Sequence, residues 1–239
     1  MSARIRLLCF PYAGGNAQSF VRWRRPLGDE IEVRPMQLPG HGERMGEPAL
    51  HTWDGLLADI RHRVRDLLDR PIALFGHSLG ALLAFECARM LTTEFAVPPV
   101  RLVVSGHRAP HLPLREAALR GLPDAEFLDR LSERSRTLRA LTDPAFRALL
   151  LPALRADFTV SETYEFTAAP PLTTPITALS GARDTDALPW ELAAWREHTT
   201  GPFDSVSFPG DHFFVDDDWE AVATTVADRL STRAEGRPG

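Results

Sequence analysis

The stretch LFGHSLGALLAFECARML, at 74–91, places a serine between two glycines where an apolar run changes into a helical pattern. A pattern of this kind predicts a sharp turn from a strand into a helix. Such a turn has no room for side chains at the positions of Gly76 and Gly80. The turn would hold Ser78 in a strained conformation with its hydroxyl exposed. We therefore predict that Ser78 is a nucleophile, and we interpret His77 as a structural residue whose side chain points away.

Short apolar runs with β-branched residues alternate with helical patterns along the chain. Strands are expected at 5–10, 31–38, 71–75, 100–105, 176–180 and 205–208. Helices are expected at 53–68, 79–91, 189–198 and 216–230. The alternation indicates an α/β protein with a mainly parallel, doubly wound sheet. A chain of 239 residues is long enough to form one large domain, which we place at 1–239.

The interval 108–171 contains proline-punctuated helical pieces and no strand pattern. One piece runs from Asp124 to Ser135, and another begins with Asp143 as its N-cap and Pro144 at the first helical position. An interval of this length is too long for an ordinary connection. We predict a helical lid packed over the ends of the strands, more mobile than the sheet, with helices that extend the core as the alternative.

Composition narrows the possible partners and the compartment. A formal net charge of −5 argues against nucleic acid as the main partner, although all 27 cationic residues are arginine. No run of about 18 apolar residues occurs, and the chain starts directly with a strand-like segment, so we expect a soluble cytoplasmic protein without a membrane partner. Cys9 and Cys87 lie in apolar segments and are expected to be buried thiols. Residues 232–239 are predicted to be a disordered tail.

A nucleophilic serine needs a base that takes its proton. His212 follows the expected strand 205–208 through a Pro-Gly turn and precedes the last helix, which is the place of the base in chains that run serine, acid, histidine. His198 belongs to a helical pattern and is expected at the surface. We therefore predict that His212 is the base.

The base needs a carboxylate that orients it. Asp184 follows the expected strand 176–180 and is the favoured acid, with Asp186 as the reserve. Asp211 is too close to His212 along the chain to reach its ring easily. All three aspartates also fit a simpler interpretation as solvated turn residues or helix caps.

The tetrahedral intermediate needs hydrogen-bond donors for its oxyanion. The backbone N–H of Leu79 is the first candidate, and that of Ala13, in the segment FPYAGG after the first strand, is the second. A phosphate-binding glycine loop is the competing interpretation, but the segment lacks both the Gly-x-Gly-x-x-Gly and the Gly-Lys-Ser/Thr pattern. We predict no cofactor and no metal.

The motifs together resemble those of the type II thioesterases that accompany polyketide synthases and nonribosomal peptide synthetases. The resemblance rests on CFPYAGGNAQSFVRW, LPGHGER, FGHSLGALLAFECAR, SGARD and FPGDHFFV, and it covers nearly the whole chain. It implies an α/β-hydrolase fold with Ser78, Asp184 and His212 as the triad, and Ala13 and Leu79 as the oxyanion hole. Family members commonly have arginine at His41, methionine at Leu79 and glycine at Asp211.

The resemblance also implies a function: hydrolysis of thioesters on the phosphopantetheine arm of an acyl or peptidyl carrier protein, which removes stalled or aberrant acyl groups. We expect a free-standing monomer. A small-molecule esterase or acyltransferase, and an inactive carrier-binding module, are the alternatives. Arginines of the lid could meet an acidic carrier protein or be solvated helix faces; they are Arg108, Arg115, Arg120, Arg130, Arg134, Arg136 and Arg139.

Overall fold

The computed structural model describes residues 3–115, 118–134 and 143–231. Within them, parallel strands form a six-stranded sheet in the order β2-β1-β3-β4-β5-β6. The strands are β1 (Ile5–Phe10), β2 (Ile31–Pro35), β3 (Ile72–His77), β4 (Arg101–Ser105), β5 (Ile176–Gly181) and β6 (Phe203–Phe208). All six lie where the sequence predicts strands, and the parallel α/β architecture is confirmed. The strand expected at 31–38 is shorter, because the chain leaves the sheet after Pro35.

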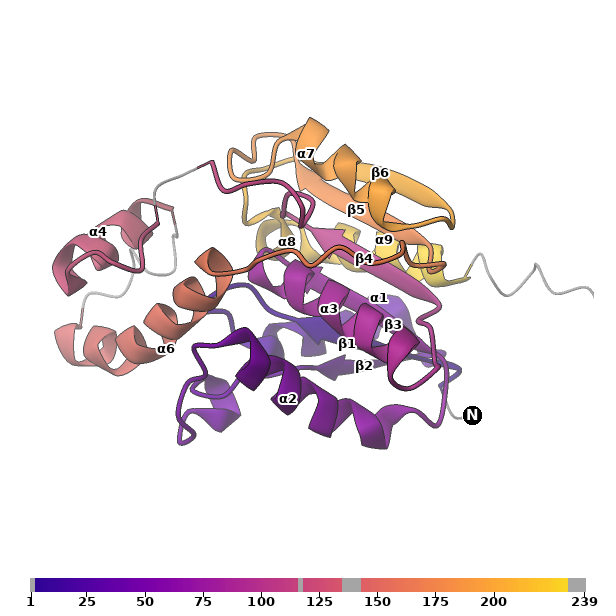
Figure 1. The fold of residues 1–239 in the computed structure, drawn as a ribbon, viewed down its shortest axis with the longest axis horizontal. Coiled ribbons are helices and arrows are strands. Elements are labelled where there is room, and N and C mark those ends of the chain that lie inside the picture. The colour runs from indigo at the N-terminus through magenta and orange to yellow at the C-terminus, as the bar shows by residue number, and fades with distance from the viewer. Residues whose placement is uncertain (1–2, 116–117, 135–142, 232–239) are drawn as a thin grey trace, which may run out of the picture.

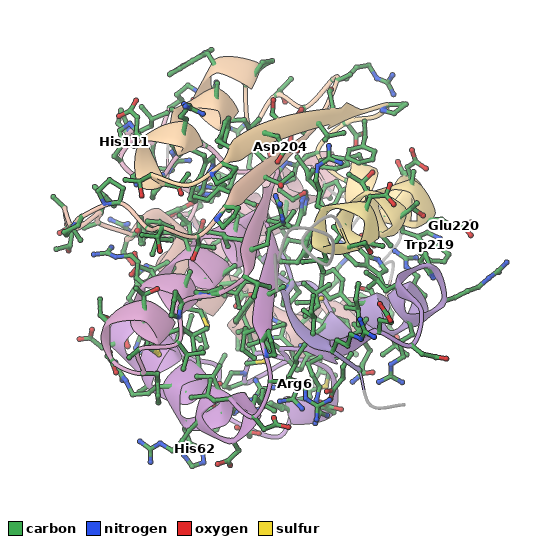
Figure 2. The ribbon with its side chains drawn as sticks, turned by 90° about the vertical axis from the view of Figure 1, so that its right-hand side faces the viewer. Arg6, His62, His111, Asp204, Trp219 and Glu220 are labelled. Atoms are coloured by element: carbon green, nitrogen blue, oxygen red, sulfur yellow. The ribbon has the colours of Figure 1, made fainter. Side chains whose placement is uncertain are left out.

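Helices cover both faces of the sheet (Figures 1 and 2). The α-helices are α1 (Arg24–Leu27), α2 (Trp53–Val64), α3 (Leu79–Thr93), α4 (Asp124–Arg134), α6 (Pro144–Glu162), α7 (Pro189–Ala193), α8 (Phe214–Asp217) and α9 (Trp219–Ser231). Short 3₁₀ segments span Ala17–Trp23, Gly42–Arg44, Arg65–Leu67 and Ala194–His198. Figure 2 shows α9, with Trp219 and Glu220, on the opposite side of the sheet from α2 and α3.

The two faces of the sheet bury separate apolar clusters. Leu56 and Ile60 of α2 pack with α3 against one face, while Val222 and Val226 of α9 pack against the other. Helix α3 is buried on nearly all sides, as its uniformly apolar sequence predicts. Because β1, β3, β4 and β5 are covered on both faces, they are almost continuously apolar.

Three of the expected helices are shorter than predicted. The pattern at 53–68 forms α2, which ends at Val64, and then a 3₁₀ segment. The pattern at 189–198 forms α7 and then a 3₁₀ segment, and the pattern at 216–230 is split because Asp218 leaves the helical conformation, with φ −120° and ψ 38°. The expectation that His198 lies at the surface is wrong. Its ring is buried against Phe85 and Trp195, and its Nε2 lies 2.7 Å from Nδ1 of His111.

Helices α4 and α6 lie beyond the end of the sheet opposite the N-terminus, where the parallel strands have their carboxyl ends (Figure 1). Together with Leu119, which precedes α4, they form a small apolar cluster through Phe127, Leu131 and Leu154. The Asp143 carboxylate caps α6 by accepting the Ala145 N–H at 2.8 Å, as predicted. The predicted end of the α4 helix at Ser135 and the predicted tail at 232–239 lie outside the described residues.

Cys9 and Cys87 are buried, free thiols, as predicted. Among the helices that the structure describes, none is both long and apolar enough to cross a membrane.

Candidate active site

Ser78 has the strained backbone that the two glycines predict. Its φ is 54° and its ψ is −121°, at the junction of β3 and α3. A Cβ atom on Gly76 would lie 1.9 Å from the carbonyl oxygen of Gly80, and one on Gly80 would lie 2.2 Å from that of Phe10. Both positions therefore exclude any side chain, and the turn that presents Ser78 depends on both glycines.

The loops after β5 and β6 are held side by side. The N–H of Ala182 donates to the carbonyl of Phe208, and that of Arg183 donates to the carbonyl of Gly210, both at 2.8 Å. These bonds continue the pairing of β5 with β6 beyond the ends of the strands. They carry the segment after β5 towards the segment that holds His212.

Asp184 and His212 meet between these loops. Nδ1 of His212 lies 3.0 Å from Oδ2 and 3.2 Å from Oδ1 of Asp184. The Asp184 carboxylate is fully buried, and its Oδ1 also accepts the N–H of Asp186 at 2.9 Å. The Asp186 carboxylate is more distant, at 4.0 Å from the same ring nitrogen. The geometry thus pairs the ring with Asp184, the acid that the sequence favours, and leaves Nε2 for a second partner.

The acidic surroundings of His212 change its acidity. Burial disfavours the charged ring, but the carboxylates of Asp184, Asp186 and Asp211 outweigh that effect and raise the pKa of His212 above its ordinary value. Asp211, which stands where the family commonly has glycine, therefore shifts the pKa of this ring upwards.

The side chain of His77 is expected to point away from the site, but it lies against His212. Its ring centroid is 4.9 Å from that of His212, and its Nδ1 lies 2.9 Å from the hydroxyl oxygen of Ser105. Burial, with the neighbouring charge of His212, keeps the pKa of His77 well below its ordinary value. A neutral ring next to Ser78 in the chain thus packs against His212. Sequence patterns give no signal for this contact, which depends on how β3 and the His212 loop meet.

The two predicted oxyanion donors lie on neighbouring segments. Leu79 is the first residue of α3, where a backbone N–H has no partner within the helix and the helix dipole favours negative charge. Ala13 lies in the loop after β1, and the contact between Gly80 and the carbonyl of Phe10 brings that loop against the start of α3. The structure therefore brings the segments of Ala13 and Leu79 together.

Asp184, Asp186 and His212 also form a group whose ligand atoms lie within 4.8 Å of one another among the described residues. Two oxygen ligands and one nitrogen ligand are compatible with a divalent cation. The contact between Asp184 and His212, however, is also what a base and its orienting acid require.

Some of the lid arginines make contacts within the protein. Arg115 binds the buried carboxylate of Glu191, with 2.7 Å between Nε and Oε1. Arg108 donates to the carbonyl of Leu112 at 3.2 Å, and Arg120 donates to that of Glu162 at 3.1 Å. Arg115 thus joins the lid to the body of the protein, whereas the bonds of Arg108 and Arg120 lie within the lid. The side chain of Arg134, together with Arg136 and Arg139, lies outside the described residues.

Comparisons with known proteins identify the family. A family model for the thioesterase domain matches residues 5–230. Thioesterase PikA5 of Streptomyces venezuelae is 38% identical over 96% of this chain and 82% of its own length. A protein of Brevibacillus parabrevis, linear gramicidin dehydrogenase LgrE, is 36% identical over 99% of this chain and 92% of its own.

A solved structure agrees with these matches. The type II thioesterase BorB from the borrelidin biosynthetic cluster superposes with a TM-score of 0.86 and 33% identity, over 96% of this chain and 95% of that chain. The turn at Ser78 and the contact between Asp184 and His212 are the arrangement expected of a serine hydrolase. The chain therefore belongs to the thioesterase domain family and is a thioester hydrolase of the α/β-hydrolase fold.

Proposed function

We propose that this chain hydrolyses acyl groups from the phosphopantetheine arm of acyl or peptidyl carrier proteins, and that it clears stalled or aberrant intermediates in polyketide or nonribosomal peptide biosynthesis. The contact between Asp184 and His212, whose ring packs against that of His77 next to Ser78 in the chain, is the observation that carries the chemistry. The biosynthetic setting rests on the relatives, among which BorB is a type II thioesterase of a biosynthetic cluster.

In the first half of the reaction, the Ser78 oxygen attacks the thioester carbonyl and its proton passes to Nε2 of His212. Asp184 holds the ring through Nδ1 and stabilises the imidazolium that forms. The N–H groups of Ala13 and Leu79 donate to the oxyanion of the tetrahedral intermediate. The C–S bond then breaks, and the departing thiolate takes the proton from His212, which leaves an acyl-serine ester.

Water completes the turnover. His212 accepts a proton from the attacking water, the ester C–O bond breaks, and the proton returns to the Ser78 oxygen as the free acid leaves. A thiolate is a better leaving group than an amine, so that acylation of the serine requires less acid catalysis than in a protease. No cofactor enters this scheme.

The first test concerns Ser78. A fluorophosphonate is expected to add one covalent mass at Ser78 in the wild-type protein and none in Ser78→Ala. Hydrolysis of an acyl thioester is expected to fall to background in Ser78→Ala and in His212→Ala. Full activity of either variant would refute the mechanism.

The second test concerns the carrier protein. The same acyl group is offered on a carrier protein, on free pantetheine and as a simple ester, and hydrolysis is followed by intact mass or by thiol release. The proposal expects the highest kcat/KM with the carrier protein. Equal values for the carrier and free pantetheine would refute the role of the carrier, and a preference for the simple ester would favour the alternative of a small-molecule esterase.

A further inference from the structure

A buried carboxylate of the lid reaches the loop that holds Ala13. Asp157 lies on α6 and is only 3% exposed. Its Oδ2 accepts the backbone N–H of Gly14 at 2.7 Å. One side chain of the lid thus binds the backbone at the residue that follows Ala13, the second predicted oxyanion donor.

His41 lies against the same carboxylate oxygen. Its Nε2 lies 3.0 Å from Oδ2 of Asp157, within ion-pair distance although the N–H does not point at the oxygen as a hydrogen bond requires. Its Nδ1 lies 3.1 Å from the carbonyl oxygen of Pro39. Burial opposes the charge, but Asp157 and the Pro39 carbonyl together raise the pKa of His41.

The segment around Gly14 is closely fitted to α6. Gly14 has a φ of +73°, and a Cβ atom on it would lie 2.4 Å from Cδ2 of Leu154, one turn before Asp157 on the same helix. The N–H of Gly15 donates to the carbonyl of Tyr12 at 2.8 Å and closes the turn around Ala13. The conformation of this turn is therefore fixed both by its own hydrogen bond and by the seating of α6.

Helix α6 is itself anchored near Asp157. The indole N–H of Trp53, on α2, donates to the carbonyl of Val160 at 2.8 Å. Val160 lies less than one turn from Asp157 and is completely buried. Asp157 thus belongs to the part of the lid that is fastened to the body of the protein, and it can act as a fixed support for the loop.

We infer that Asp157 is a positioning residue, which holds the turn around Ala13 through the Gly14 N–H, so that formation of the oxyanion hole depends on helix α6 being seated. The inference rests on the proposed roles of Ser78 and Ala13. It assigns the lid a part in the chemical step as well as in access to Ser78.

Two substitutions, each with a side chain close in size to that of aspartate, separate the charge of Asp157 from its ability to accept the Gly14 N–H. Asp157→Asn keeps an acceptor for the Gly14 N–H but removes the charge, whereas Asp157→Leu removes both. The matched control is Glu162→Gln. Glu162 is another carboxylate of α6, and it binds the N–H groups of Leu119 and Arg120 within the lid, at 2.6 and 2.9 Å, without reaching the Ala13 loop.

The readout is the hydrolysis of a short acyl-N-acetylcysteamine thioester, with kcat and KM determined separately. Asp157→Leu is expected to lower kcat by about 10- to 100-fold. This decrease does not exceed the decrease in kcat that removal of a direct oxyanion donor causes. Its KM is expected to stay near the wild-type value. Asp157→Asn is expected to lower kcat less, and Glu162→Gln to leave kcat near that of the wild type. A misplaced lid alone would instead change KM in the Asp157 and Glu162 variants alike.

The outcomes separate this inference from the proposed function. Absence of fluorophosphonate labelling at Ser78 in the wild type would overturn both. Labelling of the wild type together with an unchanged kcat in folded Asp157→Leu, or with equal losses in Asp157→Leu and Glu162→Gln, would overturn the inference alone. If circular dichroism shows Asp157→Leu to be unfolded, the kcat of Asp157→Asn tests the inference instead. The neutral amide is a weaker acceptor than the carboxylate, and this variant is expected to lower kcat by about threefold or more. A wild-type kcat in Asp157→Asn would overturn the inference.

Discussion

Gly181 and Asp211 approach each other so closely that a Cβ atom on Gly181 would lie 2.4 Å from the carbonyl oxygen of Asp211. Gly181 ends β5, three residues before Asp184, and Asp211 directly precedes His212. The closeness of the two backbones sets the separation of the acid and the base. The absence of a side chain at the end of β5 is therefore a condition for the contact between Asp184 and His212.

Gly181→Ala is expected to push the two loops apart and lower kcat by about 10- to 100-fold, because small displacements of catalytic groups are costly. It is also expected to lower the free energy of unfolding by about 1–3 kcal/mol, the usual cost of overpacking. Steady-state kinetics and urea denaturation measure the two effects. Gly46→Ala is the control, since a Cβ atom there meets nothing within 4 Å. Wild-type kcat in folded Gly181→Ala would contradict this account.

Asp184→Asn is expected to lower kcat by about 10³- to 10⁴-fold, as the loss of an orienting carboxylate does in serine proteases. Asp186→Asn should leave kcat close to the wild-type value, since its carboxylate lies 4.0 Å from Nδ1 of His212, against 3.0 Å for Asp184. The two variants carry the same chemical change two residues apart. Comparable losses in both would show that the acid is wrongly assigned.

Asp211→Asn is expected to extend activity to lower pH. His212 must be neutral to accept the proton from Ser78, so kcat/KM rises as the pH increases through the pKa of His212. Asp211 contributes to raising that pKa, and its removal therefore lowers the midpoint of the acidic limb. The amide oxygen of asparagine can still accept the N–H of Phe213, as Oδ1 of Asp211 does at 3.0 Å. The pH profile of kcat/KM measures the shift, and an unchanged or higher midpoint would contradict it.

Arg115→Met is expected to destabilise the fold by about 2 kcal/mol, because it leaves the Glu191 carboxylate buried without its cation. The value is below that of a fully buried pair, since 36% of the Arg115 side chain is exposed. The double variant Arg115→Met/Glu191→Gln should recover part of the loss, because the neutral amide can still accept the Leu188 N–H that Glu191 binds at 2.8 Å. Urea denaturation of the three proteins tests this, and equal stability of the single and double variants would refute it.

Local patterns in the sequence determine much of this protein. The apolar runs place all six strands, and two glycines define the turn at Ser78, because a strand-to-helix turn of this kind excludes side chains at fixed positions. The order of serine, acid and histidine, each after a strand, identifies Ser78, Asp184 and His212 as candidates. These features depend on neighbours in the chain, and the residues themselves therefore reveal them.

Contacts between distant segments are decided only by the tertiary structure. Whether Asp184 or Asp186 faces His212 depends on how the loops after β5 and β6 pair, and the placement of His77 against His212 depends on the same packing. Asp157 gives no sequence signal, since an aspartate on a helix is most often solvated, yet it is buried 143 positions from the glycine it binds. The sequence thus specifies which groups can do the chemistry. The distances, the burial and the pKa values that make them work arise where separate elements meet, because hydrogen bonds and desolvation depend on position in space and not on position in the chain.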